Sequence, residues 1–419
     1  MVASEPSDQQ GQVQSRTVRV LASAQILSGV GTSGTVAAGS LLVSSISKSS
    51  TLAGLAQTAS VLGAALMAIP LARLTNRGGR RLALTSGYIV GSSGAALAIV
   101  GGATRLLPIV LIGALLMGAA SASSYQARFA AIDLATAQSR ARNLSVVVWA
   151  STVGAVTGPN LITPSGSLAN ALGLPRLVGP YLLAATTLLF SVTVIRLFLR
   201  PDPYLLANQL GDIAQRPKQL PMRVVLGVIA RNRRALLGVS AVAIGHLVMV
   251  GVMVMTPVHM KQTDISLTII GLVISVHILG MFAFSPLVGW LSDRLGRVRA
   301  IQIGVLLLVA ASVTAGTARG MGAWQLGAGL FLLGLGWSFT LVAGSTLLSE
   351  SVDDDVRSST QGTSDLIMNL MGAGGGALAG VIIGLLNYHW LCGLALIPVA
   401  VLAAGSIVVT PKAQIKGQG

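Results

Sequence analysis

The sequence predicts an all-α membrane protein whose twelve transmembrane helices form two six-helix bundles. Composition gives the first reason, because 53% of the 419 residues are hydrophobic and only 10% are charged. A water-soluble domain of this size could not carry that balance without exposing large apolar patches. The other two reasons are the recurrence of apolar runs long enough to cross a membrane and a basic turn that is repeated in both halves.

Apolar runs of about twenty residues have the length that a membrane-spanning helix needs. We expect such helices near residues 18–45, 49–73, 82–101, 107–128, 143–165, 178–199, 235–258, 265–291, 299–316, 322–348, 362–385 and 388–409. One long polar stretch divides them into two sets of six. The predicted organisation is a disordered cytoplasmic tail (1–16), an N-terminal six-helix bundle (17–199), a cytoplasmic linker (200–234), a C-terminal six-helix bundle (235–410) and a second cytoplasmic tail (411–419).

The basic residues predict how the chain is oriented. If both ends are cytoplasmic, the outer connections hold five of the 28 lysines and arginines, namely Lys48, Arg105, Arg176, Lys261 and Arg319. Cytoplasmic loops are enriched in Lys and Arg, so we expect a multi-pass protein of the inner (cytoplasmic) membrane with both termini in the cytoplasm. The net charge of +16 then reflects orientation in membrane lipid, and we expect no nucleic-acid partner.

A short basic turn marks an internal duplication. Residues 76–80 read Asn-Arg-Gly-Gly-Arg after the second span, and residues 293–297 read Asp-Arg-Leu-Gly-Arg after the eighth. Aligning Gly79 with Gly296 superimposes the arginines of the two turns. A turn shared by both halves indicates a repeat. We expect the following residues of these turns to act in the conformational change: Arg77, Arg80, Asp293, Arg294, Gly296 and Arg297.

This turn resembles the signature loop of the major facilitator superfamily, which is close to Gly-x-x-x-Asp-Arg-x-Gly-Arg. Gly289, Asp293 and Arg297 match it in the second half, whereas Ala72 and Asn76 depart from it in the first. The resemblance implies the major facilitator fold and a secondary transporter, not an enzyme, in which two bundles rock around a central site. The sequence has no nucleotide-binding loop, so we expect no use of ATP. We also expect a monomer without a cofactor.

In the fifth span, Gly154, Gly158 and Pro159 are similar to the Gly-x-x-x-Gly-Pro core of the superfamily's antiporters. Small residues let helices approach closely, and a proline removes one backbone donor. These three residues therefore predict helix packing and a local break in the helix, and they carry no information on the substrate.

One polar cluster closes the fourth span. Arg128 and Asp133 lie there with Tyr125 and Gln126. Ionisable residues near a span are costly and mark functional candidates. We expect an ion pair or a helix-end anchor at the cytoplasmic gate, and the alternative is a proton or substrate relay.

The seventh and eighth spans concentrate soft ligands. Five of the twelve methionines and three of the four histidines fall between residues 246 and 281. Met249 and Met253 share one helical face, as do His277 and Met281, because residues four apart are neighbours on a helix. At about 1.5 Å per residue both pairs lie near mid-membrane. Thioether and imidazole ligands together favour Cu(I).

These two pairs are similar to the signature of the CcoA-like copper importers of the superfamily, which supply copper for bacterial cytochrome oxidase assembly. The resemblance implies a bacterial protein that binds copper, as its transported substrate, through Met249, Met253, His277 and Met281. Candidate accessory ligands are His246, His259 and Met260.

Other readings of the same residues stay open. Methionine is a common apolar filler, and these side chains could line an adaptable cavity for a small organic solute such as a drug or riboflavin. A copper sensor that binds the metal without moving it is a further alternative.

Overall fold

The computed structural model describes residues 6–135, 140–209, 221–318 and 322–409, and every regular element in these ranges is helical. The first half consists of α1 (Pro6–Ser47), α2 (Leu55–Thr104), α3 (Leu107–Ala130), α4 (Arg140–Asn160), α5 (Ile162–Ala171), η1 (Arg176–Val178) and α6 (Gly179–Phe198). The linker contributes α7 (Pro203–Gln209) and α8 (Met222–Arg231). The second half consists of α9 (Arg233–Gln262), α10 (Leu267–Phe282), α11 (Ser285–Leu295), α12 (Arg297–Gly316), α13 (Ala323–Glu350), α14 (Asp354–Leu385) and α15 (Tyr388–Val409).

These helices form the twelve predicted crossings. Ten helical segments of the described chain are long and apolar enough to span a membrane, and the pair α4 and α5, bent by 53°, makes an eleventh. The twelfth comes from α2, whose 50 residues change direction at Gly79 (φ 84°, ψ 178°) and so cross the membrane twice. The chain is therefore an all-α membrane protein, as its sequence predicts.

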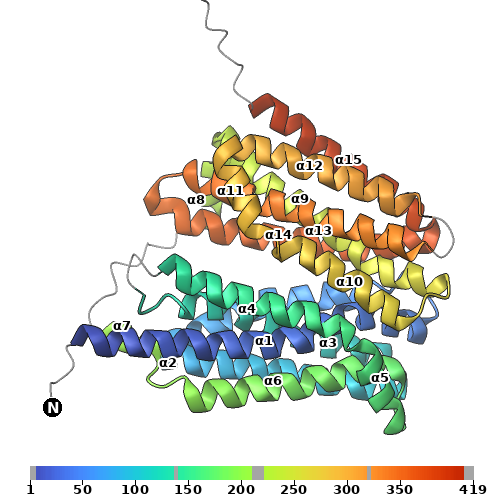
Figure 1. Cartoon of the computed structure of the whole chain (residues 1–419), viewed down its shortest axis with the longest axis horizontal. Coiled ribbons are helices and arrows are strands. Elements are labelled where there is room, and N and C mark those ends of the chain that lie inside the picture. The colour runs from blue at the N-terminus through green and yellow to red at the C-terminus, as the bar shows by residue number, and fades with distance from the viewer. Residues whose placement is uncertain (1–5, 136–139, 210–220, 319–321, 410–419) are drawn as a thin grey trace, which may run out of the picture.

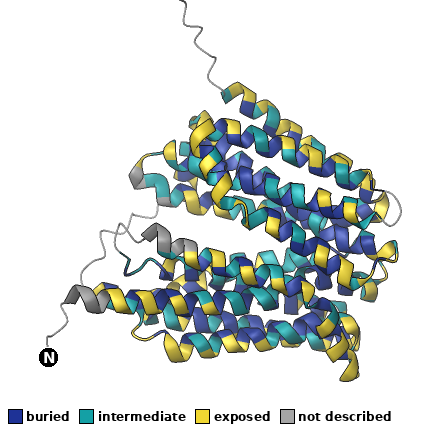
Figure 2. Ribbon diagram, viewed as in Figure 1, coloured by how far each residue is buried: buried dark blue, intermediate teal, exposed yellow. Residues whose placement is uncertain are grey.

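Figure 1 shows the helices in two groups, α1 to α6 and α9 to α15, which lie side by side. The groups touch mainly where α4 meets α10 and where α2 meets α14. We call the side that carries the Gly79 and Gly296 turns and the linker the basic face, and the other side the opposite face. Figure 2 shows buried residues between the helices and exposed residues along the outer surfaces. Large apolar side chains such as Leu66, Trp149 and Ile407 are exposed there, as expected of surfaces that contact lipid.

Two predicted boundaries differ from the structure. The first helix begins at Pro6 and so includes most of the expected tail. It continues because the helix is anchored at this end, where the Gln14 side chain donates a hydrogen bond to the Ala131 carbonyl oxygen (2.7 Å). The expected linker contains α7 and α8, because the apolar side chains Val225 and Ile229 of α8 are buried against the second half. The expected tail 411–419 lies outside the described residues.

The two halves are joined on the opposite face. The described residues form four hydrogen bonds between the halves, and all lie toward that face: Thr58 to the Ala373 carbonyl (3.0 Å), Asn160 to Ser275 (2.7 Å), Ser275 to the Val156 carbonyl (3.0 Å) and Thr163 with Thr268 (3.0 Å). This arrangement is a state that is closed on the opposite face.

Candidate functional site

A polar cavity of about 140 Å³ lies inside the first half, between α1, α2, α3 and α6. No charged residue lines it. Its polar lining consists of Thr32, Ser33, Thr35, Gln57, Ser60, Ser121 and Tyr181. Uncharged hydroxyl and amide groups in a membrane bundle suit a solute that forms hydrogen bonds and carries no net charge.

Part of this lining is free to bind a solute. The Thr32 and Thr35 hydroxyls are already used, because they donate to the Ser28 and Thr32 carbonyl oxygens (2.8 and 2.7 Å). Within the described chain, the Ser33 hydroxyl is buried without a partner. A Cβ on Gly158 would collide with this hydroxyl, so it packs against α4 and leaves the other hydroxyl and amide groups of the lining to contact a solute.

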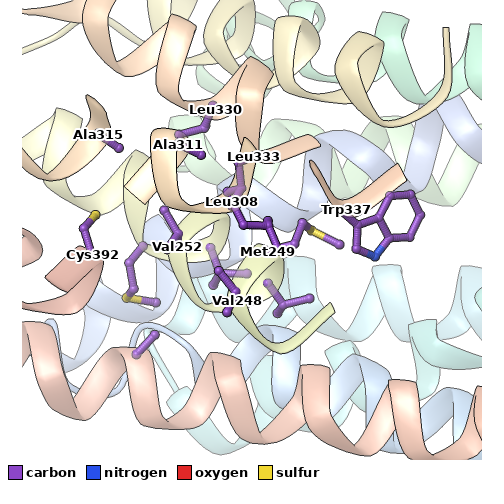
Figure 3. Packing of buried hydrophobic residues seen from close by; sticks show 14 of the residues in the cluster. Val248, Met249, Val252, Leu308, Ala311, Ala315, Leu330, Leu333, Trp337 and Cys392 are labelled. Carbon is purple, nitrogen blue, oxygen red and sulfur yellow. The ribbon is translucent and has the colours of Figure 1, made fainter. Parts of the chain in front are cut away.

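The four predicted copper ligands lie on two helices, α9 and α10, that make little direct contact with each other. Helix α13 packs against both α9 and α10, whereas those two helices barely touch each other. Met249 is buried in the apolar core of the second half, where Figure 3 shows it beside Leu308 and Trp337. Met253 and Met281 are half-buried at the edge of the same core.

His277 lies at a different height along α13. Its Nδ1 is 2.7 Å from the Leu330 carbonyl oxygen, and this contact makes Nδ1 the protonated nitrogen. The His246 Nδ1 atom instead accepts a hydrogen bond from Trp337 (3.0 Å). Leu330 and Trp337 are two helical turns apart, which corresponds to about 10 Å. The buried Nε2 of His277 has no hydrogen-bond partner among the described residues.

Two of the accessory candidates, His259 and Met260, have other neighbours. The His259 ring stacks on Tyr388, with centroids 4.4 Å apart, and lies 5.9 Å from the His389 ring. Met260 is fully buried in the apolar core. The described residues contain no group of three or more His, Cys, Asp or Glu side chains that could hold a metal ion.

The polar cluster at the end of the fourth span is divided among several partners. Asp133 forms its ion pair with Arg80 (2.7 Å) and not with the expected Arg128. Gln126 accepts a hydrogen bond from Thr75 (3.0 Å). The expectation of an Arg128–Asp133 pair fails because the Gly79 turn brings Arg80 closer to that carboxylate.

Arg128 has a different environment. Its guanidinium lies 5.4 Å from the Tyr125 ring centroid, and its buried Nε has no hydrogen-bond partner in the described structure. It interacts electrostatically with Asp365 of α14, in the other half, without forming a direct ion pair. Arg128 and Asp365 therefore interact across the two halves on the basic face. No hydrogen bond between described residues joins the halves on that face.

The two basic turns form similar networks. Arg80 binds Asp133 through two hydrogen bonds (2.7 and 3.0 Å), and Arg297 binds Glu350 (2.8 Å) and Asp293. Asp133 and Glu350 each lie 53 residues after the arginine that they bind. Arg77 is exposed, and Arg294 lies 5.3 Å from the Trp290 ring centroid.

The linker supplies an acid to the first turn. The Asp202 carboxylate accepts hydrogen bonds from the backbone amides of Arg80 (3.2 Å) and Arg81 (2.7 Å). Tyr204 donates its hydroxyl proton to Asn76 (2.9 Å). An acid at the start of a helical segment satisfies its free amides. Asp202 therefore stabilises the turn that Asn76 leaves without an acid of its own.

Gly154 and Gly158 lie where α4 crosses α1. A Cβ atom on Gly154 would collide with the Ile26 carbonyl oxygen, and one on Gly158 would collide with Ser33. Pro159 immediately precedes the bend between α4 and α5. These residues set the close packing of the first half beside the polar cavity.

Sequence reasoning did not identify the cavity residues Gln57, Ser60 and Ser121. An amide within an apolar span was a usable signal for Gln57. No such signal existed for the serines, because small polar residues occur throughout transmembrane helices. The contact of Asp202 with the first turn could not be recognised, because the Arg80 and Arg81 amides lie more than a hundred positions away in the sequence.

A membrane-spanning fold of two six-helix halves with a polar cavity in the first half is typical of a membrane transporter, not of an enzyme. The chain matches the Major Facilitator Superfamily over residues 21–264 and again over residues 239–418. It is 36% identical over 405 residues to the MFS-type transporter YdeG of Bacillus subtilis, covering 95% of this chain and 94% of the relative. The chain belongs to the Major Facilitator Superfamily.

Two further similarities are more distant. The riboflavin transporter RfnT of Brucella anthropi is 28% identical over 362 residues, which cover 84% of this chain and 85% of the relative. The crystal structure of a D-xylose–proton symporter has a TM-score of 0.70 at 17% identity, covering 93% of this chain and 96% of that chain. The second similarity concerns the fold alone.

Proposed function

We propose that the chain transports a small, uncharged, polar organic solute by alternating access. The observation that carries this proposal is the cavity of the first half, which is lined by hydroxyl and amide groups and by no charge. A solute with several hydrogen-bonding groups matches such a lining, because a transporter must replace the hydrogen bonds that the solute leaves in water.

The proposed orientation places the basic face in the cytoplasm of a bacterial cell. The distribution of Lys and Arg supports this orientation through the positive-inside rule. The four hydrogen bonds between the halves then close the outer side. A cavity of about 140 Å³ is smaller than the roughly 300–1,000 Å³ of a typical ligand site. The cavity must therefore widen during the transport cycle before a whole solute fits.

Riboflavin is the first solute to test. The distant relative RfnT is a riboflavin transporter, and riboflavin is an uncharged molecule rich in hydroxyl groups. Purified protein is placed in liposomes that are preloaded with unlabelled riboflavin, and labelled riboflavin is added outside. Exchange across the membrane requires neither a known direction nor a known coupling ion.

We expect wild-type liposomes to accumulate label and the exchange rate to fall at least about fivefold in the Gln57→Leu variant, since one lost hydrogen bond costs about 1–3 kcal/mol. Gln325→Leu is the matched control, because Gln325 lies on α13 near the opposite face and bonds to Thr314 (3.0 Å). Unchanged exchange by Gln57→Leu would contradict the assigned cavity. Exchange of copper but of no neutral solute would contradict the substrate class.

Copper is the second candidate substrate, and one observation favours it. The His277 Nε2 atom is buried without a hydrogen-bond partner in the described chain. An imidazole nitrogen with no proton and no partner is a common metal ligand. Met249 and His277 lie on α9 and α10, two helices that make little direct contact, which counts against a single site in this state. If copper is the substrate, cells that produce the wild type accumulate copper, and cells that produce Met281→Leu at equal levels do not.

A further inference from the structure

A second cavity, of about 570 Å³, lies between the two halves on the opposite face. The first half contributes the end of α1, Thr163 of α5 and Arg176 of η1. The second half contributes Lys261 near the end of α9 and the start of α10. This volume falls in the range of small-molecule sites, which is about 300–1,000 Å³.

The cavity is positively charged. Arg176 and Lys261 line it from opposite halves, and no carboxylate does. Neither cation forms an ion pair with another residue of the described chain. The one acid close by in sequence, Asp264, is exposed and lies outside the lining. Two cations without a counter-charge in one cavity attract a multivalent anion.

The start of α10 adds a second, independent source of positive potential. Ser266 is the N-cap of this 16-residue helix and accepts a hydrogen bond from the Ile269 amide (3.4 Å). Ser266, Leu267 and Thr268 all line the cavity. The free amides in the first turn of a helix, together with the helix dipole, favour an anion at this position.

Hydroxyl groups complete the lining and connect the halves. The side chains of Thr163 and Thr268 form a hydrogen bond with each other (3.0 Å), and Ser44 and Ser45 line the cavity from α1. Hydroxyls donate readily to phosphate and carboxylate oxygens. The full set of donors exists only while the two halves are closed on this face, because each half supplies one cation.

We propose that this cavity binds a small multivalent oxyanion of the phosphate class and that the bound anion holds the two halves closed on the opposite face. A ligand shifts a conformational equilibrium by its difference in affinity for the two states. The anion contacts both Arg176 and Lys261 only in the closed state, so binding favours that state. In the proposed orientation the anion acts from outside the cell and slows the transport cycle.

Inorganic phosphate is the probe for the test. Purified full-length protein is titrated with phosphate at constant pH and ionic strength, and its binding is followed by the melting temperature. We expect the wild type to be stabilised and the Arg176→Gln/Lys261→Gln variant to bind at least tenfold more weakly. Lys48→Gln/Arg105→Gln is the matched control, since these cations belong to the same face but do not line the cavity. Lys261→Arg should retain binding.

Cross-linking reports on the closure itself. Asn160 and Ser275 are joined across the halves but lie outside the cavity lining. In a Cys392→Ser background, Asn160→Cys and Ser275→Cys should form a disulfide faster with phosphate present. In the melting-temperature titration, an equal response to phosphate of the wild type and the Arg176→Gln/Lys261→Gln variant, or no response of either, would overturn the site. Phosphate binding without faster cross-linking would overturn its role in closure.

Discussion

The two halves build the same basic turn from different surroundings. In the first half, Arg80 and Asp133 are 13% and 14% exposed, and Asp202 of the linker covers the turn. In the second half, Arg297 is 19% exposed, but its partner Glu350 is 48% exposed, and nothing lies close to Gly296. A duplicated sequence motif therefore became a partly buried anchor in one half and a more solvent-exposed ion-pair network in the other.

The halves also differ at mid-membrane. The first half has a polar cavity lined by Gln57 and several hydroxyl groups, whereas the second half has Met249, Leu308 and Trp337 packed in an apolar core. The proposed solute cavity therefore lies in one half, and the matching region of the other half is closely packed. Each prediction that follows changes matching residues in the two halves or at the interface between them.

The largest difference is expected at the glycines of the two turns. Both have a positive φ (84° at Gly79 and 91° at Gly296), which costs a non-glycine residue about 1–3 kcal/mol. A Cβ on Gly79 would also collide with the Asp202 carboxylate, whereas Gly296 is open. We expect Gly79→Ala to lower the melting temperature of the purified protein clearly more than Gly296→Ala. Equal shifts would show that the linker does not secure the first turn.

The ion pairs should differ next. Asp133→Asn leaves Arg80 partly buried without its partner, which we expect to cost about 2 kcal/mol of folding free energy. Glu350→Gln should cost less than about 1 kcal/mol, because exposed pairs contribute little. Chemical denaturation of both variants at low and high salt measures this. A larger loss of folding free energy in Glu350→Gln than in Asp133→Asn would contradict this difference between the halves.

The interface between the halves offers a kinetic prediction. Arg128 and Asp365 attract each other across the halves on the basic face, so their pairing should stabilise the state closed on that face. We expect Asp365→Asn to slow solute exchange about tenfold, which corresponds to about 1.4 kcal/mol. The exchanged pair Arg128→Asp/Asp365→Arg should restore part of the rate, and Asp264→Asn is the control. A normal rate in Asp365→Asn would remove these residues from the transport cycle.

The smallest effect is expected in the core of the second half. Met249→Leu conserves volume among Leu308 and Trp337, so it should cost less than about 1.5 kcal/mol and leave transport within about twofold. A large loss of transport at normal stability would mean that the Met249 sulfur contacts the substrate. That result would make copper the leading candidate substrate.

Much of the fold was predictable from the sequence. Span length, the Lys and Arg distribution and the repeated turn predicted twelve helices in two bundles, because lipid forces each crossing to be a long apolar helix. The ends were less predictable. The helix start at Pro6 depends on a contact between Gln14 and Ala131, which no local pattern in the sequence records.

The candidate site was harder to predict for a different physical reason. Helical spacing places Met249 beside Met253 and His277 beside Met281, but spacing does not reveal which neighbouring helix each face meets. Because α9 and α10 both pack against α13 and touch each other little, helical spacing alone could not show whether the two pairs meet. The polar cavity depends on serine and threonine residues whose side chains reveal their role only after the helices pack.

Riboflavin exchange by three proteins at equal amounts in liposomes tests the central claim most directly. They are the wild type, Gln57→Leu, and a variant with Met249, Met253 and Met281 changed to Leu and His277 changed to Ala. If the first half binds the solute, exchange falls at least about fivefold in Gln57→Leu and persists in the Met and His variant. Loss of exchange in the Met and His variant with normal exchange in Gln57→Leu would contradict this account.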